Sequence, residues 1–144
     1  MKSRLSCALV TLVTISLMYG LVACSGGGGG TTQSQTTSTS TPVLSLSSSS
    51  INFGNQASTT TRTVTVTNSG TAGLVISNLA IVGPNAAAFA VTPGTPITVS
   101  PGSVTTLTLA FAPTVSGSCS ATLAVTSNDS GSPHMVGLAG MSLL

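Results

Sequence analysis

The stretch Thr63-Val64-Thr65-Val66-Thr67-Asn68-Ser69-Gly70 alternates threonine with valine and then ends on turn-forming residues. A period of two places the valines on one face of a β-strand and the threonines on the other. Comparable apolar or alternating runs follow at 74–82, 106–111, 119–125 and 134–139, with glycine, proline and asparagine between them. The sequence therefore predicts a domain built from β-strands.

The predicted domain covers residues 43–140. Turn signals recur every 8–12 residues within this range, which gives about seven short strands. That number of strands in this length predicts an all-β fold, an immunoglobulin-like antiparallel β-sandwich. The remaining divisions are a signal segment (1–23), a linker that includes Cys24 (24–42) and a C-terminal tail (141–144).

The N-terminal segment resembles the signal peptide of a bacterial lipoprotein. Lys2 and Arg4 precede an apolar run, which closes on the lipobox-like tetrapeptide Leu21-Val22-Ala23-Cys24. The resemblance implies cleavage between Ala23 and Cys24 and acyl chains, palmitate among them, on Cys24, which together hold a protein at a membrane. Two alternatives stay open: an uncleaved membrane-spanning helix over 5–23, and an ordinary secretory signal with a different cleavage site.

The linker after Cys24 is rich in glycine, serine and threonine and carries no charge. Such composition predicts a flexible, disordered tether. Whether its hydroxyl groups carry glycans stays open.

The charge of the chain is small. The formal net charge is +2, and two of the three basic residues, Lys2 and Arg4, belong to the predicted signal peptide. Processing leaves Arg62 against Asp129, so the mature chain has no basic patch. We therefore expect no nucleic-acid partner.

Several motifs resemble the abnormal-spindle/hydin (ASH) immunoglobulin-like domains, also called choice-of-anchor D. They are Ile51-Asn52-Phe53-Gly54-Asn55-Gln56, Val64 to Gly70, Gly83 to Val91, Ser100-Pro101-Gly102, Phe111-Ala112-Pro113-Thr114 and Val136 to Gly140. The resemblance implies a non-catalytic module of extracytoplasmic or ciliary assemblies. Many bacterial relatives carry cysteines near the positions of Thr95 and Val104, and an acidic residue where Ala88 stands. This chain departs at all three, so no family disulfide is carried over.

A Cys–His–Asp relay of Cys119, His134 and Asp129 is the catalytic hypothesis to weigh. If the strands of Cys119 and His134 form a hairpin, the two residues lie roughly 20–23 Å apart. We therefore predict no catalytic, metal or cofactor site and no enzyme activity, with Cys119 as a small core residue. No disulfide is expected, because Cys7 leaves with the signal and Cys24 takes lipid.

The favoured function is a lipid-anchored module of the cell envelope that acts through contacts with another envelope or extracellular protein. Ser25, rather than aspartate, follows Cys24, which favours the outer membrane; whether the domain faces the periplasm or the cell surface stays open. The alternative is a surface module that binds glycan or another ligand through Thr63, Thr65 and Thr67. The low charge also leaves strand edges poorly guarded against pairing with another chain.

Overall fold

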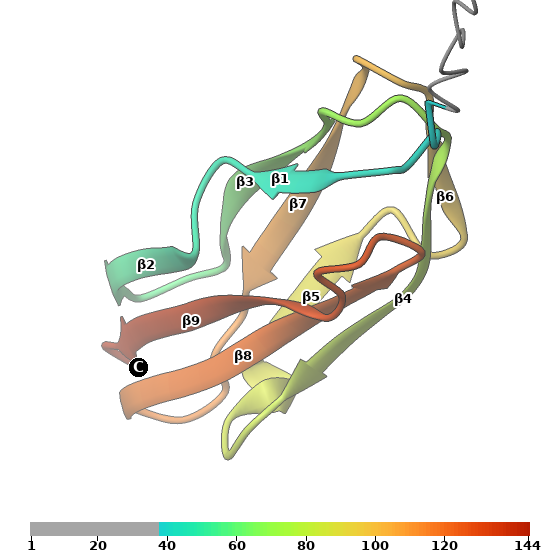
Figure 1. The fold of residues 1–144 in the computed structure, drawn as a ribbon. Coiled ribbons are helices and arrows are strands. Elements are labelled where there is room, and N and C mark those ends of the chain that lie inside the picture. Colours follow the sequence, from blue (N-terminus) through green and yellow to red (C-terminus); the bar gives the residue numbers. More distant parts are fainter. Residues whose placement is uncertain (1–37) are drawn as a thin grey trace, which may run out of the picture. The chain divides into compact units, whose positions relative to one another are not determined.

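The computed structural model describes residues 38–144; the lipobox, both residues at the predicted cleavage site and most of the tether lie outside the described residues. These residues form nine strands and one 3-10 turn (Figure 1). They are β1 (Leu44–Leu46), β2 (Ser50–Gln56), β3 (Thr60–Asn68), β4 (Leu74–Val82), η1 (Ala86–Ala88), β5 (Phe89–Thr92), β6 (Ile97–Val99), β7 (Val104–Phe111), β8 (Gly117–Ser127) and β9 (His134–Ser142). Within 38–144, no helix is long and apolar enough to cross a membrane. The predicted all-β sandwich is confirmed.

Two sheets face each other. The strand order is β1-β3-β7-β5 in the four-stranded sheet and β2-β9-β8-β4-β6 in the five-stranded sheet. The chain changes sheets at every connection between strands except the one between β8 and β9. The structure has nine strands where the sequence predicted about seven, and two of the nine, β1 and β6, have only three residues each.

One pairing differs from an antiparallel sandwich. β2 runs parallel to β9, with Ser50 opposite Gly137 and Ile51 opposite Leu138. β2 keeps the direction of β1 after the chain crosses between the sheets, and β9 shares that direction. β9 also continues to Ser142, and Leu143 donates its amide hydrogen to the Gln56 carbonyl at 2.8 Å.

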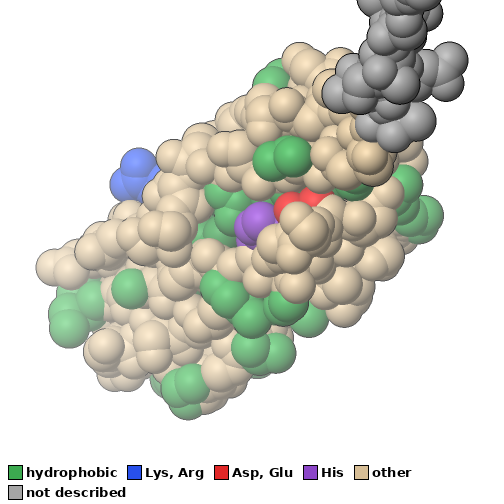
Figure 2. Space-filling view, in the orientation of Figure 1, with side chains coloured by type: hydrophobic (Ala, Val, Ile, Leu, Met, Phe, Trp, Pro, Cys, Tyr) green, Lys and Arg blue, Asp and Glu red, His purple; other side chains and the backbone are tan. Residues whose placement is uncertain are grey.

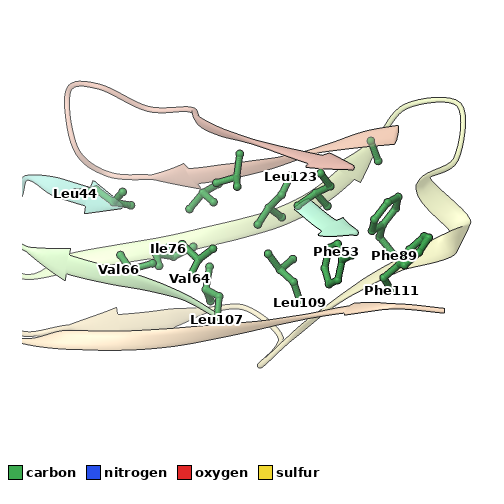
Figure 3. Packing of buried hydrophobic residues seen from close by; sticks show 14 of the residues in the cluster. Leu44, Phe53, Val64, Val66, Ile76, Phe89, Leu107, Leu109, Phe111 and Leu123 are labelled. Atoms are coloured by element: carbon green, nitrogen blue, oxygen red, sulfur yellow. The ribbon is translucent and has the colours of Figure 1, made fainter. Parts of the chain in front are cut away.

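The core lies between the sheets and consists of the side chains that alternate inward along each strand (Figure 3). Phe53, Phe89 and Phe111 form its aromatic end, with ring centroids 4.9–5.8 Å apart. Gly140 makes room for this cluster, because a Cβ there would lie 2.8 Å from the Phe111 ring. Phe53 and Phe111 are fully buried, and Phe89 nearly so.

A buried asparagine joins the other end of the sandwich. The Asn68 side chain is fully buried. Its Oδ1 accepts hydrogen bonds from the Val43 and Gly70 amides, and its Nδ2 donates to the Ala72 and Val99 carbonyls, at 2.7–3.3 Å. Asn68 thereby ties the chain before β1 and the end of β6 to the β3–β4 turn. Because every donor and acceptor of this buried side chain is bonded, its burial does not destabilise the fold. Loss of the side chain would leave the backbone groups that it bonds without this partner.

Candidate functional site

The structure keeps Cys119 apart from the other two residues of the hypothetical relay. Cys119 is 4% exposed, faces the core and stands opposite Gly140. His134 stands opposite Val125, six residues farther along β8. The prediction that Cys119 packs in the core is confirmed, and the described residues contain no group of three or more side chains arranged to hold a metal ion.

Asp129 and His134 do meet. The loop between β8 and β9 brings His134 Nε2 to 2.9 and 3.1 Å from the two carboxylate oxygens of Asp129. Asp129 also accepts hydrogen bonds from Ser127 Oγ at 2.6 Å and from the Leu44 amide at 3.4 Å. Figure 2 shows the red and purple side chains of this group side by side. Sequence reasoning missed it, although a five-residue spacing across a hairpin loop was the available signal.

We call Asp129, His134, Ser127 and the Leu44 amide the Asp129 cluster. The Asp129 side chain is 5% exposed and that of His134 is 22% exposed. Burial raises the pKa of Asp129, but hydrogen bonds from Ser127, His134 and Leu44, with the attraction of His134, outweigh burial and lower that pKa below its usual 3.8. Because both oxygens are engaged inside the protein, the cluster joins the β8–β9 loop to β1 and offers little to a substrate.

The threonine face forms the outside of the four-stranded sheet. Thr63 stands opposite Thr108, Thr65 opposite Thr106, and Thr92 also opposite Thr108. The prediction that Thr63, Thr65 and Thr67 share the face opposite the buried valines is confirmed. All three phenylalanines of the chain are buried, so the described residues present no exposed aromatic ring beside these hydroxyl groups.

A trough runs along the outer face of β9, between β2 and β8. It consists of two adjoining hollows of about 280 and 320 Å³ that share Asn52 and Ala139. Gly137 and Ala139 lie on the β9 strand between β2 and β8, and their small size keeps the trough open. The other lining residues are Ser50, Ile51, Gly54, Asn55, Ser118, Cys119, Ser120, Ala121, Leu138, Gly140 and Met141.

The β9 trough contains no charged side chain. Its walls offer hydroxyl and amide groups, and Met141, which is 43% exposed, stands at one end. Met135, 52% exposed, lies farther along β9 on the same outer face. Flexible methionine side chains adapt to the shape of a partner. A neutral, shallow surface of this kind suits contact with a protein surface better than capture of a charged small molecule.

Comparison with known proteins gives a family and a fold. The family model described as "HYDIN/CFA65/VesB-like, Ig-like domain" matches residues 42–141. No curated protein matches the chain.

Three solved structures illustrate the likeness. A protein of unknown function from Porphyromonas gingivalis W83 is 22% identical (TM-score 0.62), with 71% of this chain and 47% of that one covered. The ASH/PapD-like domain 7 of human CEP192 is 15% identical (TM-score 0.55), with 83% of this chain and 97% of that domain covered. The secreted serine protease VesC of Vibrio cholerae is 18% identical (TM-score 0.51), with 69% of this chain and 23% of the protease covered. The chain thus spans about half of the first protein and under a quarter of the protease, and these likenesses establish the fold alone.

Proposed function

Because this chain belongs to the HYDIN/CFA65/VesB-like Ig-like domain family, we propose that it is a non-catalytic protein-interaction module held at the bacterial cell envelope. The observation that carries the interaction role is the β9 trough, an open, uncharged surface on a rigid sheet. The acid, imidazole and thiol groups of the domain support this role, because they serve internal contacts or packing.

The interaction surface is tested by placing a photo-crosslinking amino acid at Ala139 in the floor of the trough. We expect discrete adducts of higher mass in intact cells. The same amino acid at Thr106, on the threonine face, is the matched control and should give none. Absence of adducts at Ala139, or equal adducts at both positions, would contradict the proposal.

The anchor in this proposal is a lipid on Cys24, supported by Leu21-Val22-Ala23-Cys24. Ser25 after the cysteine supports the outer membrane as the destination. Cys24→Ala should abolish incorporation of labelled palmitate and leave a heavier, unprocessed chain. Incorporation that survives this substitution would refute the anchor while leaving the interaction role intact.

A second candidate is glycan binding by the threonine face, favoured by the direct pairing of Thr63 with Thr108 and Thr65 with Thr106. It predicts saturable binding of the protein to a polysaccharide. Binding should disappear when Thr63, Thr65 and Thr67 are replaced by alanine, and should persist when Ala139 is altered.

A further inference from the structure

Half of β4 is a free sheet edge. β4 runs from Leu74 to Val82, but β6 pairs with it only from Leu74 to Ile76. Residues 78–82 have β8 on one side and, within the described part of the chain, no paired strand on the other. Figure 1 shows β6 beside only the first part of β4.

The register identifies the backbone groups on this free edge. Asn85 donates its amide hydrogen to the Ser120 carbonyl, and the Ser120 amide donates to Asn85 Oδ1, so the backbone of Ser120 points toward the β4 side of β8. Backbone direction alternates along a strand. Every second residue of β8 therefore forms backbone hydrogen bonds with the β4 residue opposite it. These hydrogen-bonded pairs are Thr122 with Val82, Ala124 with Ala80 and Thr126 with Asn78.

It follows that the N–H and C=O groups of Leu79 and Ile81 point away from β8. Within 38–144, the structure pairs none of these four groups. Leu79 and Ile81 are half-buried and pack against the core, so the edge is held in its extended shape before any partner arrives.

The other edges are protected by the chain itself. On β2, Ser48 Oγ both donates to the Ser50 carbonyl at 2.6 Å and accepts from the Ser50 amide at 3.3 Å. On β1, the outward Leu44 amide is bonded by Asp129. β5 is followed by Pro93 and β6 is preceded by Pro96, and proline limits strand pairing. β4 is also followed by a proline, Pro84, but within 38–144 no side chain or strand bonds the outward backbone groups of Leu79 and Ile81.

We propose that a second copy of this chain pairs with the free half of β4, antiparallel and centred on Ala80. Leu79 of one copy then exchanges both backbone hydrogen bonds with Ile81 of the second copy, and the two-fold axis repeats the exchange. The unpaired backbone groups of one copy are thus bonded by the same groups of the second copy, as a two-fold symmetric interface requires. This inference rests on the proposed function, since it names one partner of the module.

Charge permits this approach. Arg62, on β3 of the other sheet, and the enclosed Asp129 are the only residues of the Lys, Arg, Asp and Glu types among those described. No like charges therefore meet across the β4 edge, and a net charge near zero favours association.

The test is disulfide trapping with Ala80→Cys in the full chain. Centring on Ala80 makes it a non-hydrogen-bonded pair with its counterpart, with Cα atoms about 4.5 Å apart, which a disulfide spans. Ala124→Cys is the matched control, because Ala124 stands directly opposite Ala80 but one strand inside the edge. The parent chain, which retains Cys7, Cys24 and Cys119, gives the background.

After mild oxidation we expect a covalent dimer with Ala80→Cys at least about tenfold above both the parent and Ala124→Cys. Adding Leu79→Pro, which removes one edge donor, should lower that yield about tenfold, since lost strand bonds weaken pairing. No dimer above background, or equal dimer from Ala124→Cys, would overturn the proposal. Photo-crosslinks at Ala139 that persist in that case would leave the interaction module standing with a different partner.

Discussion

The two sides of the sandwich, where the edges of its sheets come together, differ in whether their backbone groups are hydrogen-bonded. On one side the Asp129 cluster bonds the Leu44 amide and joins the β8–β9 loop to β1. On the other side the backbone groups of Leu79 and Ile81 are left unpaired beside half-buried apolar side chains. We call these the closed side and the open side.

The difference shows how a nearly uncharged domain protects its edges. Natural sheets commonly guard an edge with lysine or other charged side chains. This chain places its single acidic side chain on one edge and uses the neutral Ser48 hydroxyl on another. With so few charges available, the side that receives none stays open to another strand.

The largest expected effect comes from Asn68, which supports both sides through Val43 and Val99. Asn68→Ala removes the buried side-chain partner of four backbone groups and should lower the free energy of unfolding by about 3–4 kcal/mol. Urea denaturation measures the loss. The control is Asn128→Ala: Asn128 also bonds two backbone groups, of Gly73 and Val75, but is exposed and should cost about 1 kcal/mol. Similar losses for both would show that burial of Asn68 does not matter.

The next effect separates the two sides directly. Asp129→Ala removes the acceptor of the Leu44, Ser127 and His134 bonds on the closed side, and should lower the free energy of unfolding by about 2–3 kcal/mol. Asn78→Ala, an exposed position on the open side, should change it by less than about 0.5 kcal/mol. Both are read from urea unfolding at neutral pH. Equal losses would erase the distinction between the sides.

Acid should weaken the closed side alone. The pKa of Asp129 in the folded protein lies below its usual 3.8, because three hydrogen bonds favour the carboxylate. Its contribution is therefore complete above about pH 4 and is lost as the pH falls through the folded pKa. Asp129 is the chain's only acidic side chain, so Asp129→Asn should remove this acid dependence from unfolding curves measured between pH 5 and about 2. An unchanged dependence would mean that Asp129 does not hold the closed side.

The smallest effect concerns single amides on the open side. In dilute protein, the Leu79 and Ile81 amides should exchange with deuterium at least about tenfold faster than the Ala80 amide, which is bonded to β8. Nuclear magnetic resonance resolves each amide. Protection of Leu79 equal to that of Ala80 at high dilution would place a bond where the structure shows none.

Much of the fold was predictable from local pattern. The alternation of Thr63 to Thr67 gave β3 its inner and outer faces, and Pro113 after Phe111 agreed with the end of β7. Side-chain alternation has a physical cause within one strand, so sequence alone reveals it. The ASH resemblance is likewise confirmed at the level of the Ig-like domain, while the lipid anchor on Cys24 stays a prediction.

The contacts between segments were not predictable in the same way. Asn68 looked like part of a turn signal, yet it is buried because the chain before β1 and the end of β6 converge on it. Gly70 also looked like a turn glycine; its actual requirement is space, since a Cβ there would overlap the Thr41 carbonyl oxygen. Both depend on segments far apart in sequence, which local periodicity does not report.

The parallel pairing of β2 with β9 has a mechanical consequence. Tension applied between the start of β2 and the end of β9 pulls two parallel neighbours in opposite directions along their length. Every rung of that ladder, from Ser50–Gly137 to Gln56–Ser142, then bears the load together instead of parting one after another. The β2–β9 ladder is thereby suited to resist shear between its two strands.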